Sequence, residues 1–155
     1  MTAPAPDLTD LYRQIVLEHS RHPRNQRRPD GPVREGEGHN PLCGDKVRVY
    51  ATVQDDVLAD VAWEASGCAI CTASASLMSE AARGRPVAGA RALAVGFEAA
   101  LAAGGTALAG DLAALAGVGR YPARIRCATL PWRTLVAALD AAPAPVTTEP
   151  PATPP

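Results

Sequence analysis

Apolar and polar residues alternate along residues 46–53, the most regular pattern in the chain. The apolar positions are Val47, Val49, Ala51 and Val53, and the polar positions are Lys46, Arg48, Tyr50 and Thr52. A period of two predicts a strand with one face in the core and one face in water. Gln54-Asp55-Asp56 has the composition of a turn, and residues 57–65 predict a returning strand. An antiparallel hairpin follows, with Trp63 in the core or on the face of the sheet.

The start of the chain has a helical period instead. The apolar face of this helix is formed by Leu11, Tyr12, Ile15 and Val16. We expect the helix to begin after a cap at Thr9 or Asp10 and to end at Pro23.

Further helices are predicted after the hairpin. The first occupies residues 68–83, where Gly84 suits the C-terminal cap and Pro86 prevents continuation. An Ala-rich helix spans about residues 87–103, and a short helical piece is expected at 111–116.

The last helix contains a proline, which leaves two alternatives for its start. The helix should begin at Pro122 or soon after, and its apolar positions are Leu130, Leu135, Val136 and Leu139. If the helix includes Cys127, Pro131 removes the hydrogen bond to the Cys127 carbonyl and kinks the helix. If the helix begins near Thr129, Pro131 lies in its first turn. We favour the kinked alternative.

This order of elements indicates an α+β fold, with a small antiparallel β-sheet packed against helices. The length of 155 residues is that of one domain with its own core, and we assign it to residues 8–141. The Pro-rich ends, residues 1–7 and 142–155, are expected to be disordered tails.

Charge and hydropathy exclude several classes of function. The chain has 15 basic and 16 acidic residues, so its net charge gives no argument for nucleic acid or a membrane surface. No apolar run approaches the ~20 residues of a membrane span, and the N-terminus lacks the pattern of a secretion signal. A basic cluster consists of Arg21, Arg24, Arg27 and Arg28. Two interpretations are open for it: contact with an acidic partner, or simple solvation. Four cysteines in such a chain favour metal or sulfur chemistry in the cytoplasm over disulfides.

Three of these cysteines lie in separate segments. Cys43 precedes Asp45 by two residues, Cys68 begins a predicted helix, and Cys127 lies near the start of another. Three thiolates and one carboxylate would satisfy a tetrahedral zinc ion, and a helix N-terminus favours the thiolate form. Isolated cysteines are also common as small buried residues, so spacing alone leaves both interpretations open.

Two smaller features have alternatives of their own. Cys71 could replace Asp45 as a ligand or act as a resolving thiol beside Cys68, but we favour a small buried residue. His19 and His22 could share a helix face as a metal pair. The favoured interpretation is a helix end that carries polar residues near its C-terminal dipole.

Four motifs, in this order, resemble the SufU/IscU family. They are Leu11-Tyr12-Arg13-Gln14-Ile15-Val16 with His19 and His22-Pro23-Arg24-Asn25; Asn40-Pro41-Leu42-Cys43-Gly44-Asp45; Gly67-Cys68-Ala69-Ile70 with Ala73-Ser74-Ala75-Ser76; and Pro122-Ala123-Arg124-Ile125-Arg126-Cys127-Ala128-Thr129-Leu130-Pro131-Trp132. The likeness covers about residues 8–141 and implies the fold of that family.

Within the family the chain is similar to the SufU branch. Arg126 stands where the IscU scaffold branch has a His before its last cysteine. The 59-residue step from Cys68 to Cys127 (127 − 68) has room for the insertion of SufU proteins, and the Leu-Pro-Pro-Val-Lys segment of the scaffold branch is not found. Two positions depart from the family: Cys71 and Pro131 both stand where Ser is commoner.

The resemblance implies a zinc-dependent sulfurtransferase that accepts persulfide sulfur from a SufS-type cysteine desulfurase for iron–sulfur cluster biogenesis. The implied zinc ligands are Cys43, Asp45, Cys68 and Cys127. Cys43 would also accept the sulfur after a desulfurase histidine replaces it on the zinc, and Arg124 would orient Asp45 or steer an anionic persulfide. A downstream Suf iron–sulfur scaffold would be the next partner.

Two alternatives remain. One is an IscU-type scaffold that holds iron or an iron–sulfur cluster with the same ligands. The other is a non-catalytic, zinc-stabilised interaction module.

Overall fold

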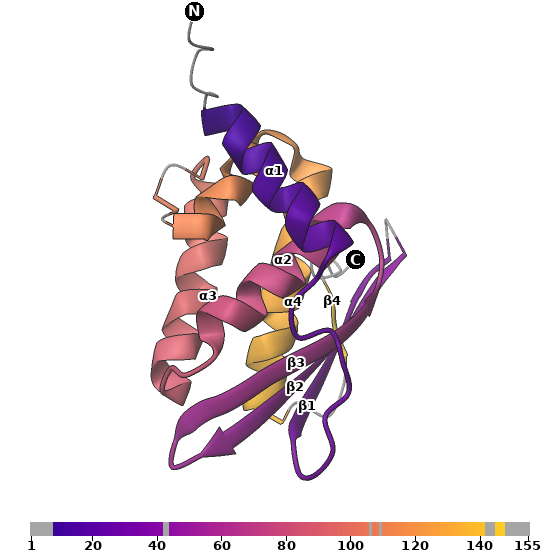
Figure 1. Ribbon diagram of the computed structural model, residues 1–155, viewed down its shortest axis with the longest axis vertical. Coiled ribbons are helices and arrows are strands. Elements are labelled where there is room, and N and C mark those ends of the chain that lie inside the picture. Colours follow the sequence, from indigo (N-terminus) through magenta and orange to yellow (C-terminus); the bar gives the residue numbers. More distant parts are fainter. Residues whose placement is uncertain (1–7, 42–43, 106, 109, 142–144, 148–155) are drawn as a thin grey trace, which may run out of the picture.

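The helices of the protein cover one face of a twisted sheet (Figure 1). The computed structural model describes residues 8–41, 44–105, 107–108, 110–141 and 145–147. In this part of the chain the strands are β1 Arg34–Asn40, β2 Asp45–Gln54, β3 Val57–Ser66 and β4 Val146–Thr147. Their order across the sheet is β3-β2-β1-β4; β1, β2 and β3 pair antiparallel, and β4 pairs in parallel with β1.

The helices form two layers behind the sheet. They are α1 Leu8–Arg21, α2 Ala69–Ala82, α3 Val87–Ala102 and α4 Pro122–Leu139, with a 3-10 helix, η1, at Gly110–Arg120. α2 and α4 pack directly on the strands, α1 packs on α2 and η1, and α3 packs on α4. The α+β class is therefore confirmed. None of the helices described has both the length and the apolar character needed to cross a bilayer.

The predicted hairpin is β2 and β3. Val47, Val49 and Ala51 are buried, whereas Lys46 and Arg48 are exposed, as the alternation requires.

Two aromatic residues of the hairpin are buried on opposite faces. Tyr50 lies on the polar face, where its hydroxyl donates to Glu64 at 2.5 Å and the Arg28 guanidinium lies 5.9 Å from its ring centre. Trp63 is fully buried, and its indole N–H donates to the Arg24 carbonyl at 2.8 Å, which confirms its place in the core.

β1 was not predicted because its inward-facing positions are not apolar. Gly36 and Gly38 occupy two of them, and both face α4. A Cβ atom at position 36 would overlap the backbone at Thr134 and Ala138, and one at position 38 would overlap the Thr134 side chain. The strand therefore uses glycine to let the backbone of α4 approach closely, and this removes the hydrophobic alternation that normally reveals a strand.

Three expected boundaries were wrong. α1 begins at Leu8, so Thr9 and Asp10 lie within the helix. Leu8 already continues the apolar helical spacing of Leu11 and Tyr12. The piece expected at 111–116 is longer and is a 3-10 helix over residues 110–120. The C-terminal tail was expected from residue 142, but Val146–Thr147 pairs with β1 at Gly38 and His39. The remaining tail residues, 1–7, 142–144 and 148–155, lie outside the described part.

The last helix includes both Cys127 and Pro131. α4 begins with Pro122 at its N-terminus and continues through Pro131 to Leu139. Of the two alternatives, the start before Cys127 is the one observed. Pro131 has no N–H to donate to the Cys127 carbonyl, which is the reason for expecting a kink. The kink itself stays a prediction.

Small polar residues of α2 join it to its neighbours. Ser74 Oγ donates to the Ala128 carbonyl at 2.5 Å and accepts the Trp132 indole N–H at 3.0 Å. Ser76 Oγ lies 2.7 Å from His19 Nδ1 and accepts the Arg24 backbone N–H at 2.8 Å. His19 lies in the last turn of α1, as the favoured interpretation expected, but it is buried there and links α1 to α2. No group of three or more potential metal ligands among the described residues includes His19 or His22.

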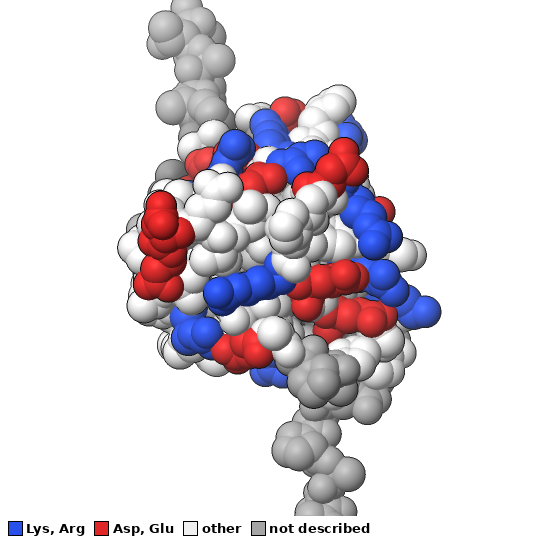
Figure 2. All heavy atoms as spheres, turned by 90° about the horizontal axis from the view of Figure 1, so that it is seen from below, with Lys and Arg blue, Asp and Glu red and all other residues white. Residues whose placement is uncertain are grey.

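The basic cluster is largely engaged within the chain. Arg24 pairs with Glu18 at 3.2 Å, and Arg27 pairs with Asp60 at 2.5 Å. Figure 2 shows that acidic and basic side chains are interleaved on the face it presents. This arrangement agrees with the near-neutral net charge and favours intramolecular ion pairs over contact with an acidic partner.

Candidate metal centre

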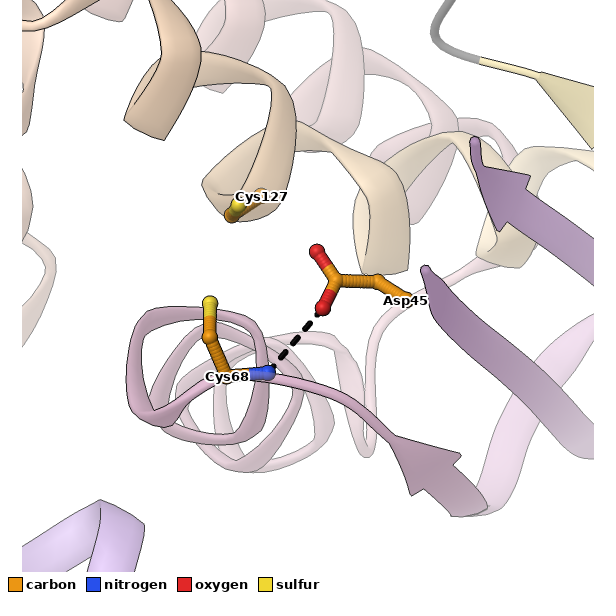
Figure 3. A group of neighbouring side chains, drawn as sticks. All are labelled: Asp45, Cys68 and Cys127. Atoms are coloured by element: carbon orange, nitrogen blue, oxygen red, sulfur yellow. Dashed lines mark hydrogen bonds between the residues drawn. The ribbon is translucent and has the colours of Figure 1, made fainter. Parts of the chain in front are cut away.

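Three potential metal ligands from distant segments meet at one end of the sheet. Asp45 begins β2, Cys68 directly precedes α2, and Cys127 lies in the second turn of α4. One carboxylate oxygen of Asp45 and the two Sγ atoms all lie within 4.8 Å of one another. Figure 3 shows the three side chains pointing into a common space.

The junction between β3 and α2 places Cys68 beside Asp45. Cys68 is the N-cap of α2, and its Sγ accepts the Cys71 backbone N–H at 3.5 Å. Its own backbone N–H donates to Asp45 Oδ1 at 3.0 Å, drawn as the dashed line in Figure 3. A Cβ atom at position 67 would overlap that oxygen, so glycine at this position is what allows the carboxylate to reach the helix N-terminus. The helix end in turn favours negative charge on the carboxylate and the thiol.

Asp45 is a buried carboxylate whose described partners are amides. It is only 1% exposed. Oδ1 accepts the Cys68 N–H, and Oδ2 accepts from the Asn40 side-chain amide at 3.3 Å. No Lys or Arg among the described residues forms an ion pair with it. A buried charge is stable only with compensation, so the site is suited to a cation.

The donor set fits a small divalent metal ion. Zinc bonds of about 2.0–2.3 Å in a tetrahedron place ligand atoms roughly 3.3–3.8 Å apart. Atoms within 4.8 Å of one another reach that spacing with small side-chain movements. Two sulfur ligands favour zinc or iron over magnesium or calcium.

Within the described part of the chain, Cys68 lies beside a pocket. Cys127 is fully buried, but Cys68 is partly exposed. Cys68 lines a pocket of about 470 Å³ together with Ala69, Ile70, Gly117, Val118, Tyr121 and Arg124. Arg124 and Tyr121, in the wall of the same pocket, are exposed.

The other residues predicted for the site, Cys43, Arg124 and Cys71, have different outcomes. Cys43 lies outside the described residues. Arg124 lies in the pocket wall with Cys68 but makes no ion pair with Asp45 within the described chain. Cys71 is fully buried on α2 and does not belong to the three-residue group, in agreement with the favoured interpretation. Asn40 and Gly67 were quoted only as parts of motifs, and the contacts that give them a role appear only in three dimensions.

The chain belongs to the family described as the NifU-like N terminal domain, which matches residues 11–128. The matched residues include β1 to β3, α2 and the three potential metal ligands Asp45, Cys68 and Cys127. The SufU/IscU resemblance is therefore confirmed.

Relatives within this family carry two different names. The chain is 35% identical over 135 residues to the zinc-dependent sulfurtransferase SufU of Bacillus subtilis (strain 168), a match that covers 83% of this chain and 89% of that protein. It is also 35% identical over 135 residues to the iron-sulfur cluster assembly scaffold protein IscU of Streptococcus pyogenes serotype M1, covering 85% and 84%.

Solved structures agree with the fold. A putative iron-sulfur cluster assembly scaffold protein for the SUF system from Fervidobacterium islandicum AW-1 superposes with a TM-score of 0.75 at 28% identity. That similarity covers 86% of this chain and 99% of the other.

Proposed function

We propose that this protein is a zinc-dependent sulfurtransferase that accepts persulfide sulfur from a SufS-type cysteine desulfurase for iron–sulfur cluster biogenesis. The observation that carries the proposal is the approach of Asp45, Cys68 and Cys127 to within 4.8 Å of one another. The similarity to the Bacillus subtilis sulfurtransferase supports it. Arg126, where the scaffold branch has a histidine, favours transfer over cluster scaffolding.

Cys43, Asp45, Cys68 and Cys127 would hold the zinc ion. Cys43 is separated from Asp45 by Gly44 alone, so chain connectivity limits their Cα atoms to a separation of about 7 Å. Zinc bound by these residues would keep the thiols deprotonated and tie β2, α2 and α4 together.

Cys43 is the proposed sulfur acceptor. Its thiolate attacks the outer sulfur of the persulfide on the desulfurase cysteine. A new S–S bond forms on Cys43 as the old one breaks, and the desulfurase cysteine leaves as a thiolate. No external oxidant or reductant is required, because the oxidation level of the transferred sulfur is unchanged.

Arg124 is proposed to steer the anionic persulfide. Its side chain is exposed and lines the same pocket as Cys68. A guanidinium at the entrance attracts an incoming anion and raises the rate of encounter. Steering is preferred to the alternative of orienting Asp45, since the carboxylate of Asp45 is held by two amide donors.

Desulfurase turnover tests the proposal directly. A SufS-type enzyme is assayed alone, with the zinc-loaded protein and with the chelated protein. Stimulation by the zinc-loaded form only, lost in Cys43→Ala and retained in the matched thiol control Cys71→Ala, is the expected result. Stimulation by Cys43→Ala equal to that of the wild type would refute the acceptor role. A protein that binds zinc but leaves turnover unchanged is instead an interaction module.

A second candidate is a scaffold for iron–sulfur cluster assembly. It is favoured by the equal identity to the Streptococcus pyogenes protein named IscU. Anaerobic purification separates the two functions: a colourless protein with one zinc per chain supports transfer, and visible absorbance with bound iron and sulfide supports a scaffold. The transfer proposal includes a cytoplasmic location and delivery of sulfur to a downstream Suf scaffold.

A further inference from the structure

The side chain of Asn40 contacts two of the candidate ligands at once. Asn40 ends β1 and is paired directly with Asp45 across the sheet. Its Nδ2 lies 3.3 Å from Asp45 Oδ2 and 3.6 Å from Cys127 Sγ. An amide NH₂ group carries two hydrogens, so it can serve both atoms at the same time.

The oxygen at the other end of the same amide is buried. Asn40 is 1% exposed, and its Oδ1 has no hydrogen-bond partner among the described residues. Buried carbonyl oxygens of this kind are rare, because an unpaired polar atom is destabilising. Rotating the amide by half a turn would point Oδ1 at the carboxylate and the sulfur, where it would repel both when they carry negative charge. The orientation of the Asn40 amide is therefore explained if the Asp45 carboxylate and the Cys127 sulfur are both anionic and both accept its N–H groups.

We propose that Asn40 is a positioning residue of the metal centre. Its amide holds the Asp45 carboxylate and the Cys127 sulfur in the orientation that binds the ion, and it stabilises their negative charge as ligands. Asn40 thereby sets the affinity for the metal and keeps Asp45 in place as a ligand. The inference rests on the metal part of the proposed function but not on sulfur transfer.

A purely structural role makes different predictions. An asparagine that only joins β1 to β2 would change the stability of the fold equally with and without metal. A positioning residue changes the affinity for the ion and the geometry of its ligands as well. Metal binding by the protein alone, without a desulfurase, therefore separates the two roles.

Two substitutions of Asn40 and one control are required. Asn40→Ala removes both hydrogen bonds, and Asn40→Ser keeps one hydroxyl donor for two acceptors. Asn25→Gly is the matched control, since the Asn25 amide also makes two hydrogen bonds, to Ser79 and Glu80, on the α2 side of the molecule. Glycine suits this position because Asn25 has a φ of 63°.

Zinc affinity is measured for the full-length chain by competition with a chelator, and the ligand geometry by the visible spectrum of the Co²⁺-loaded protein. Asn40→Ala should lose about 10- to 100-fold in zinc affinity and shift the cobalt bands. Asn40→Ser should lose less, and Asn25→Gly should match the wild type. If Asn40→Ala fails to fold, Asn40→Ser and its cobalt spectrum decide the question.

Wild-type zinc affinity and an unchanged cobalt spectrum in the folded Asn40 variants would overturn the inference. A wild-type chain that binds neither ion would overturn both this inference and the proposed function. A wild-type chain that binds zinc but does not stimulate the desulfurase would overturn only the function.

Discussion

The backbone of Gly67 lies against the carboxylate of Asp45, so close that a methyl group at position 67 would overlap Oδ1. The contact lies where the start of β2, the end of β3 and the N-terminus of α2 meet. The candidate metal centre therefore depends on a residue that has no ligand atom of its own.

Gly67→Ala should weaken metal binding without unfolding the protein. The added methyl group displaces the Asp45 carboxylate from the Cys68 N–H, and we expect a loss of roughly 10-fold or more in zinc affinity. Chelator competition measures the loss, and circular dichroism checks the fold. Gly89→Ala is the control, since its Cβ would meet only Pro86 at an ordinary contact distance. Equal zinc affinity in the wild type and Gly67→Ala would show that metal binding does not require the close contact between Gly67 and Asp45.

Gly36→Ala should destabilise the fold itself. Its Cβ would overlap the main chain of α4 at Thr134 and Ala138, which cannot rotate away. We expect a loss of about 1–3 kcal/mol in the free energy of unfolding, measured with urea. The opposite result is expected for Gly96→Ala, an exposed position inside α3 with open space around it, which should gain up to ~1 kcal/mol. A neutral Gly36→Ala would mean that β1 and α4 are less closely packed than described.

Ser74→Ala should leave the indole N–H of Trp132 without its described partner in the core. The Trp132 indole N–H and the Ala128 carbonyl both bond to the Ser74 hydroxyl in the core. The expected destabilisation is about 1–3 kcal/mol. The double variant Ser74→Ala with Trp132→Phe should lose less than the sum of the single variants, because the indole N–H is already gone. Strict additivity in this double-mutant cycle would argue against the bond.

The stability of the protein should fall in mildly acidic solution because of His19. Burial, together with the positive charge of Arg24, lowers the pKa of His19 below its usual value of 6.5. The unfolded chain then binds a proton more readily than the folded one, so the contribution of His19 to stability is complete above pH 6.5 and declines as the pH falls below that value. His19→Gln should show a shallower decline in urea titrations across this range.

NMR titration of the His19 ring provides an independent measurement. The expected midpoint lies below 6.5, since the imidazole is buried with its Nδ1 beside Ser76. A midpoint at or above 6.5 would contradict the predicted decline in stability.

Local patterns in the sequence predicted the hairpin and most helices, but not β1. Val47, Val49 and Ala51 reveal β2 because their burial and their apolar character coincide. In β1 the buried positions are Gly36, Gly38 and Asn40, which are selected by the closeness of α4 and by the carboxylate of Asp45. The need for glycine in β1 comes from α4, which lies about 100 residues further along the chain. A local periodicity in the sequence of β1 therefore cannot show it.

Of the predicted site residues, the described part of the chain brings together Asp45, Cys68 and Cys127, whereas Cys43 lies outside it. Sequence motifs indicated Asp45, Cys68 and Cys127, but spacing along a chain does not determine distance in space, and the convergence of their ligand atoms is a result of the fold. The role of Asn40 follows from two hydrogen bonds and one unpaired oxygen. Neither the convergence of the ligand atoms nor the contacts of Asn40 can be predicted from the order of residues in the sequence.

The two-residue strand β4 has a consequence for shortened forms of the protein. Val146 and Thr147 pair with Gly38 and His39, which lie next to Asn40 on β1. A chain truncated after Leu139 would keep every helix that the structure describes and the candidate ligands Asp45, Cys68 and Cys127. It would expose the main-chain hydrogen-bonding groups of β1 at Gly38 and His39. Bare edges of this kind recruit strands from other molecules, so such a truncation should dimerise or aggregate before it loses its secondary structure.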